Sequence, residues 1–481
     1  MKVVFLTALA AACLAAVVAS AAPEPPKIPE TPAGKRFAEL LKAHASGKPE
    51  VIREALEQAS PGLPEDRLQR RVEVMLAFRG QVGDVDLLRI QADGEHSVTG
   101  DLRSRLTEET RRVRIDVEPQ PPHAIRTIML QPVDAEPGEA PRDWSDAELE
   151  REVGAFVKRL ADAGRFSGAV LVAKNGKPLY REAFGLANRA YQVPNRPDTK
   201  FNLGSMNKMF TAVAIGQLVE RGKLRFEDTV GTHLPQFPNK DVREKVTIHQ
   251  LLSHTSGMGS YFNQEFMESS RDRFRSVADY EPLYAFEKLQ FEPGKGWAYS
   301  NSGFMLLGAI LEKVTGQSYF DYVRENIYRP AGMTNTDAYE MDSDTPNLAY
   351  GYTKMGPTGP TQEWRNNLYL HVIKGGPAGG GFSTVDDLLQ FGEALRSHKL
   401  LSAETTERMF RKQSGDQPQQ YGYGFQLGRN PGEVGHSGGF PGISSELNLY
   451  LRSGYTVAVL SNIDQGAPPV VEKLRRMLSR P

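Results

Sequence analysis

The sequence predicts a mixed α/β (α+β) protein: an antiparallel sheet flanked by helices with a helical subdomain, preceded by a small α+β domain. The chain has 481 residues, more than one hydrophobic core usually organises. Hairpin patterns stand at both ends of a long C-terminal block, and helical patterns dominate between them. A segment rich in proline and acidic residues separates this block from the smaller N-terminal part.

The N-terminus has the pattern of a secretion signal. Lys2 precedes an apolar run over residues 3–18, and Ala19-Ser20-Ala21 has the small-x-small pattern of a cleavage site. The run is short for a transmembrane helix and is followed by prolines. We expect residues 1–21 to be a cleaved signal peptide, with a secreted or periplasmic product that keeps no stable membrane insertion. The single cysteine, Cys13, lies in this segment, so no disulfide is expected.

Composition argues against a polyanionic partner. Fifty-eight basic side chains face fifty-nine acidic ones, which gives a formal charge of -1. No global positive field is available to attract nucleic acid. The expected partner is a small-molecule or peptide substrate, and the oligomeric state is left open.

The small domain is predicted over residues 28–131. Helical periodicity over 35–59 is broken at Gly47 and Pro49, which indicates two short helices. Alternating apolar residues from Val85 to Leu130 indicate strands. Residues 132–145 are the predicted linker.

The large domain is predicted over residues 146–481. It opens with a helix near 146–163 and a hairpin around Asn175-Gly176. It closes with strands over 447–451 and 455–460 and a helix from Val470. Strands from both ends that meet in one sheet leave a cleft where the sheet borders the helical insertion.

Ser205 and Lys208 form the first candidate catalytic pair. They stand at the start of an apolar helix over 209–219, and a three-residue step places them on one helix face. Serine needs a base to become nucleophilic, and a desolvated lysine titrates low enough to serve. The helix N-terminus offers N–H groups to an oxyanion. A plain N-cap serine is the alternative interpretation.

Tyr299-Ser300-Asn301 is the second element, in a loop before an apolar helix over 304–314. Tyr299 would relay a proton if nearby cations lower its pKa, and Asn301 would bind a substrate carbonyl or steady Lys208. A packed tyrosine followed by a cap at Asn301 or Ser302 is the plainer interpretation.

His436-Ser437-Gly438-Gly439 is the third element. The glycines would let a substrate backbone approach an edge strand, and the Gly439 N–H would complete an oxyanion hole with that of Ser205. A glycine-rich turn is the alternative.

The run Gly435-His436-Ser437-Gly438-Gly439 also matches the nucleophile elbow of α/β-hydrolases, with Ser437 as nucleophile. In that fold the catalytic histidine follows the serine, but His436 is the last histidine of the chain. Too little chain follows for the rest of such a fold. A trypsin-like interpretation fails for want of disulfides and of a histidine in a matching setting.

Together, Ser-x-x-Lys at 205–208, Tyr-x-Asn at 299–301 and His-Ser-Gly at 436–438 in place of Lys-Thr-Gly resemble the class C β-lactamase and penicillin-binding-protein-like serine hydrolases. The resemblance extends to residues 251–257, 328–333 and 379–384. It implies a transpeptidase/β-lactamase-like fold, catalytic Ser205, Lys208 and Tyr299, and substrate-binding Asn301, His436, Ser437, Gly438 and Gly439.

The implied function is a secreted serine hydrolase that forms an acyl-enzyme on Ser205 with ester or amide substrates, including D-amino-acid-containing or peptidoglycan-derived ones. Because a neutral histidine replaces the usual lysine, strong penicillinase activity is not expected. The alternatives are a β-lactamase or D-Ala-D-Ala carboxypeptidase and, in another class, a penicillin-recognising binding or sensor protein without turnover.

The remaining features have plainer interpretations. His254 is expected to make a loop hydrogen bond and Asp386 to stand in a helix first turn, and neither is assigned a catalytic role. The histidines show no metal-ligand spacing and no phosphate-binding glycine loop is present, so no metal or cofactor is expected. The small domain resembles the NTF2-like accessory domains through residues 115–119 and 121–123, and its role is open.

Overall fold

The computed structural model describes residues 26–133, 144–356 and 359–478. The predicted signal peptide, residues 1–21, and most of the predicted linker, 132–145, lie outside these residues. The chain divides into two compact units, Met1–Glu136 and Pro137–Pro481.

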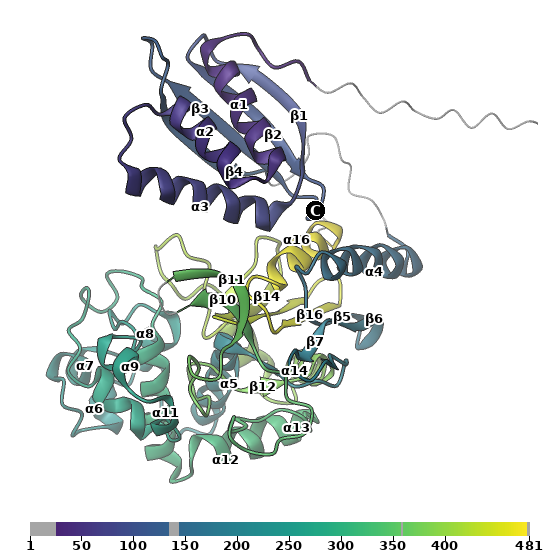
Figure 1. Cartoon of the computed structure of the whole chain (residues 1–481). Coiled ribbons are helices and arrows are strands. Elements are labelled where there is room, and N and C mark those ends of the chain that lie inside the picture. Colours follow the sequence, from purple (N-terminus) through teal and green to yellow (C-terminus); the bar gives the residue numbers. More distant parts are fainter. Residues whose placement is uncertain (1–25, 134–143, 357–358, 479–481) are drawn as a thin grey trace, which may run out of the picture. The chain divides into compact units, whose positions relative to one another are not determined.

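The N-terminal unit packs three helices on a four-stranded antiparallel sheet of order β1-β2-β3-β4 (Figure 1). Its elements are α1 (Pro32–Ser46), α2 (Pro49–Ala59), α3 (Glu65–Val82), β1 (Val85–Ala92), β2 (Ser97–Ser104), β3 (Thr110–Val117) and β4 (Ile125–Pro132). Helices α1 and α2 are the two predicted helices, separated by Gly47 in a left-handed conformation and Pro49 at the start of α2. Helix α3 was not predicted from the sequence.

The second unit is organised around a six-stranded antiparallel sheet in which both ends of the block meet, as predicted. Its order is β13 (Gln426–Leu427), β14 (Glu433–Phe440), β15 (Ile443–Tyr450), β16 (Tyr455–Ser461), β5 (Gly168–Lys174) and β6 (Lys177–Phe184). Strand β16 pairs with β5 and so joins the C-terminal strands to the hairpin of β5 and β6, with Ala458 opposite Leu171. The first hairpin turns at Asn175 and Gly176, both at positive φ.

Helices cover both faces of this sheet (Figure 1). Helices α4 (Asp146–Asp162) and α16 (Ala467–Leu478) pack on one face, and α5 (Asn207–Glu220) and α14 (Val385–Arg396) lie on the other. Helix α4 begins with a capping box formed by Ser145 and Glu148. Leu171 and Ala458 belong to the same buried core as Phe210 of α5 and Phe391 of α14.

The helical insertion lies between β9 (Phe201–Asn202) and the hairpin of β10 (Tyr352–Gly356) and β11 (Gly359–Asn366). Its main helix is α11 (Asn301–Thr315), which packs on α5. The shorter helices are α6 (Val230–His233), α7 (Lys240–Lys245), α8 (Ile248–Ser253), α9 (Gln264–Glu268), α10 (Glu281–Tyr284), α12 (Tyr319–Val323) and α13 (Arg329–Ala331). The insertion places the start of α11 beside the start of α5, where the candidate site lies.

Candidate active site

Ser205 lies in a short 3-10 turn, η1 (Gly204–Met206), that leads from β9 into α5. The Asn202 carboxamide oxygen accepts the Gly204 N–H at 2.9 Å and holds the turn. Gly204 has φ +52, and a Cβ there would lie 2.9 Å from the Gly439 nitrogen. Only glycine allows this turn to approach β14 so closely, so Ser205 is held beside Gly439.

Lys208 is completely buried one helical turn after Ser205. Its Nζ donates to Asn301 Oδ1 at 2.8 Å and to the Ala378 carbonyl at 2.5 Å. Burial lowers the Lys208 pKa well below its ordinary value. A neutral amine has two N–H groups, which these acceptors take, so its lone pair remains to accept a proton from Ser205.

Tyr299 faces the same pair. Its ring centroid lies 4.7 Å from Lys208 Nζ. Burial raises the Tyr299 pKa, and a hydrogen bond with Ser205 opposes this rise only in part. Nearby cations therefore do not lower this pKa, the condition set above for the proton relay, because desolvation dominates. Tyr299 stays a protonated phenol, suited to pass a proton to a leaving group.

His254 holds the loop that carries Tyr299 and Asn301. Its Nδ1 accepts the Ser300 N–H at 3.0 Å, and its ring centroid lies 4.4 Å from that of Tyr299. Ser300, rather than Asn301 or Ser302, caps α11 through a 2.8 Å bond from the Gly303 N–H. Asn301 is fixed by the bond from its Nδ2 to Ser260 Oγ at 3.0 Å. The loop hydrogen bond expected of His254 is present.

The His-Ser-Gly-Gly motif lies inside strand β14 rather than in a turn. Its residues pair in register with β15, from His436 opposite Leu447 to Gly439 opposite Ser444. A Cβ on Gly438 would lie 2.0 Å from the Leu203 carbonyl oxygen, whereas one on Gly439 would meet open space. The alternative of a glycine-rich turn is thus wrong, and Gly439 borders the cleft beside Ser205.

His436 is buried behind Tyr299 and is not one of the residues that line the cleft. Its Nδ1 donates to the Ser437 carbonyl at 2.6 Å, and its Nε2 accepts the Tyr421 hydroxyl proton at 2.9 Å. Burial, aided by the nearby Lys208, lowers the His436 pKa to about 3. Both ring nitrogens are therefore occupied, and the neutral ring supports Tyr299 and Tyr421. The substrate-binding role expected of His436 stays a prediction.

Ser437 does not have the geometry of a nucleophile elbow. It lies in the middle of β14, and its Oγ donates to Gln426 Oε1 at 3.2 Å. The adjacent His436 points its Nε2 to Tyr421 instead. Without a base and a sharp strand-to-helix turn, the geometry does not support Ser437 as the nucleophile.

The cleft at Ser205 has a volume of about 40 Å³. Its lining includes residues that were not predicted from the sequence as site residues, namely Gly204, Tyr261, Phe262, Phe266, His371, Val372, Ala378, Gly379, Gly380 and Phe440. The lining residues include no lysine, arginine or carboxylate. The glycine-rich run at 375–381 was the available signal for the wall containing Ala378, since chain segments that approach this closely need glycine.

His371 in this wall is neutral. Its Nδ1 donates to the Val372 carbonyl at 2.8 Å, and burial lowers the His371 pKa to about 4. Asp386, outside the cleft, stands in the first turn of α14 as expected and pairs with Arg181.

Comparison with protein families identifies the second unit. The family model described as Beta-lactamase matches residues 153–480, more than half of the chain. The chain belongs to the Beta-lactamase family. The family model leaves the first 152 residues unmatched.

Relatives of the Beta-lactamase family domain are known in sequence and structure. The chain is 34% identical over 332 residues to Penicillin-binding protein 4* of Bacillus subtilis (strain 168), covering 66% of this chain and 72% of the relative. A penicillin binding protein from Bacillus halodurans has a TM-score of 0.61 at 31% identity, over 67% of this chain and 99% of its own. A D-stereospecific amidohydrolase from Streptomyces sp. has a TM-score of 0.56 at 27% identity, over 68% and 98%.

Neither a metal site nor a membrane-spanning helix is found among the described residues. No cluster of three histidine, cysteine, aspartate or glutamate side chains is arranged to hold a metal ion within the ranges that the structure covers. Among the helices of those ranges, none combines the length and apolar character needed to span a membrane.

Proposed function

We propose that this member of the Beta-lactamase family is a secreted serine hydrolase that acylates Ser205 with esters or amides lacking a free carboxylate beside the scissile bond. The observation that carries the catalytic part is the buried Lys208 amine, one helical turn from Ser205 and with both N–H groups directed to protein acceptors. Export rests on the sequence pattern of residues 1–21.

The proposed reaction has two stages. Lys208 takes the Ser205 proton as Oγ attacks the substrate carbonyl, and the N–H groups of Ser205 and Gly439 stabilise the oxyanion. Tyr299 then protonates the leaving oxygen or nitrogen and is reprotonated from Lys208. Water, deprotonated by the same groups, cleaves the acyl-enzyme and releases the acid.

The substrate class follows from the charge of the cleft. A substrate carboxylate would need a cation, but the cleft lining contains no lysine or arginine and its His371 is neutral. His436, behind Tyr299, is also buried and neutral. Phe262, Phe266 and Phe440 offer aromatic surface to an apolar group. The similarity to an amidohydrolase whose title calls it D-stereospecific supports D-configured amides as the first substrates to test.

The decisive experiment compares substrates that differ only in charge. N-acetyl-D-alanyl-D-alanine amide should be cleaved at least tenfold faster than N-acetyl-D-alanyl-D-alanine, measured as kcat/KM. Faster cleavage of the free acid, or efficient hydrolysis of a penicillin, would favour the carboxypeptidase or β-lactamase alternative. A Ser205 adduct without any turnover would favour a binding or sensor protein.

A further inference from the structure

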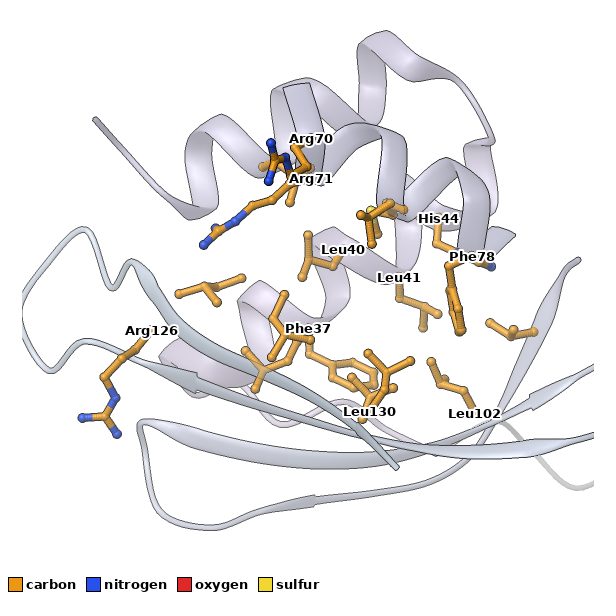
Figure 2. Close-up of a pocket in the computed structure, with 18 of the residues that line it drawn as sticks. Phe37, Leu40, Leu41, His44, Arg70, Arg71, Phe78, Leu102, Arg126 and Leu130 are labelled. Carbon is orange, nitrogen blue, oxygen red and sulfur yellow. The ribbon is translucent and has the colours of Figure 1, made fainter. Parts of the chain in front are cut away.

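The N-terminal unit contains a large apolar cavity between its helices and its sheet. Its volume is about 790 Å³, within the range of small-molecule sites, and every lining residue belongs to this unit. Figure 2 shows apolar side chains of α1 and of the sheet, among them Phe37, Leu40 and Leu102, pointing into it. The cavity is thus separate from the cleft at Ser205.

The helix α3 forms one wall and changes character along its length. Arg67, Arg70, Arg71, Val74, Met75 and Phe78 line the cavity at helical spacing. The three arginines occupy the N-terminal half of this face and the apolar side chains the C-terminal half, so the wall is cationic at one end and apolar at the other.

Strand β4 repeats this arrangement on the opposite wall. Arg126, Ile128 and Leu130 recur every second residue and line the cavity, and Ile125, at the register shift of this strand, lines it too. In Figure 2, Arg70, Arg71 and Arg126 lie toward one end of the cavity and Phe78 and His44 toward the other. Two elements far apart in sequence therefore place their positive charges at the same end.

The arginines at this end form no salt bridge in the described part of the chain, although Arg126 is attracted electrostatically by Asp116. Arg71 donates to the Ser60 hydroxyl at 2.8 Å, and neither it nor Arg67, Arg70 or Arg126 forms a salt bridge there. The cavity lining has no carboxylate. Beside them, Val74, Ile128 and Leu130 expose 63%, 40% and 47% of their surface.

We propose that this cavity binds a single-chain amphiphile with an anionic head group, of the fatty-acid type. The acyl chain lies along the apolar wall toward Phe78, and the head group meets the arginines, whose planar guanidinium groups suit carboxylate or phosphate oxygens. Burial of the chain removes the exposed apolar rim from water.

The test is calorimetric titration of the full chain with decanoate, dodecanoate and tetradecanoate below their micelle concentrations. Binding should saturate at one site and tighten about fourfold for each added methylene until the cavity is filled. Dodecanol, which lacks the charge, should bind at least tenfold more weakly than dodecanoate. Absence of saturable binding, or equal binding of dodecanol, would overturn the proposal.

Variants separate this cavity from the hydrolase cleft. The double variant Arg70→Gln/Arg126→Gln should lose at least tenfold in dodecanoate affinity, because exposed arginines on two walls are neutralised. Arg105→Gln, an exposed arginine of the same unit outside the cavity, is the matched control and should bind normally. Phosphonylation of Ser205 with a fluorophosphonate, which releases fluoride, should leave binding unchanged. Loss of binding on phosphonylation would place the fatty acid in the hydrolase cleft and refute the cavity site.

Discussion

The cleft beside Ser205 holds about 40 Å³ and is built around buried polar groups, whereas the cavity of the N-terminal unit holds about 790 Å³ and is lined by apolar side chains. In the cleft, Lys208 has fixed acceptors and a lowered pKa. In the cavity, the charges are exposed arginines at one end. Proton transfer requires desolvated and precisely held groups, while binding of an acyl chain requires volume and a charge complementary to the head group.

The largest expected effect tests the nucleophile in the cleft. Ser205→Ala should abolish labelling by a fluorophosphonate and lower turnover at least about 10³-fold, because neither the phosphonyl-serine nor the acyl-enzyme can form. Intact-mass spectrometry of the labelled protein measures this. Ser437→Ala is the matched control and should still be labelled, since its hydroxyl pairs with Gln426. Labelling lost only in Ser437→Ala would reverse the assignment.

A carboxylate beside Lys208 should remove the lowered Lys208 pKa, which distinguishes the cleft from the cavity. In Asn301→Asp, the new anion stabilises the ammonium form and raises the Lys208 pKa, so activity at pH 7 should fall about 10²-fold. Activity should recover in part as pH rises, because the amine then deprotonates. The measurement is the pH dependence of kcat/KM.

Asn188→Asp is the control for this substitution, since its carboxylate still accepts the Tyr191 N–H and lies outside the cleft lining. An Asn301→Asp profile parallel to that of the unaltered protein would argue against Lys208 as the base.

The two glycines of β14 should differ in their effect on stability. Gly438→Ala should lower the free energy of unfolding by about 3 kcal/mol, since its Cβ would overlap the Leu203 carbonyl. Gly439→Ala should cost less than 1 kcal/mol, because its Cβ meets open space. Urea denaturation of both variants measures the difference. Equal losses would show that β14 does not press against the turn at Ser205.

Acid should destabilise the second unit through its buried neutral histidines. His371 and His436 have folded pKa values of about 4 and about 3, below the ordinary 6.5. Between the folded pKa of each histidine and 6.5, the unfolded chain binds more protons than the folded chain. The stabilisation is therefore fully present above pH 6.5 and is lost as the pH falls toward the folded pKa. From pH 7 to 4.5 the loss should be on the order of 2 kcal/mol per histidine.

Urea denaturation at the two pH values measures this loss, and His436→Gln should reduce it by about 2 kcal/mol, the contribution of one histidine. The exposed His398 provides the control variant His398→Asn, which should leave the loss unchanged. A loss in His436→Gln equal to that of the unaltered protein would show that His436 titrates normally in the folded state.

The smallest effect is expected at the rim of the N-terminal cavity. Val74→Gln should change the free energy of unfolding by no more than about 0.5 kcal/mol, because this side chain is largely exposed. Val72→Ala, two residues earlier but buried, should cost about 1.5 kcal/mol. Thermal unfolding of the two variants measures the contrast. A large effect of Val74→Gln would show that the rim is packed rather than open.

Local patterns in the sequence were sufficient for the hairpin at Asn175-Gly176, the apolar helix α5 and the Ser205 and Lys208 pair. Each depends on residues within a few positions, where turn preference and helical spacing act directly. The order of the three motifs was also enough to predict the fold class, because it carries the family resemblance. Helix α3 was missed, although its apolar and basic side chains recur at helical spacing.

Only the tertiary structure decided the protonation of the site and the depth of each group within it. Lys208 meets the Ala378 carbonyl 170 positions along the chain, and His436 turns away from the cleft to bond Tyr421. Burial raised the Tyr299 pKa, whereas the sequence left open whether nearby cations would lower it. Desolvation depends on how segments distant in sequence pack around a group, and no local pattern contains that information.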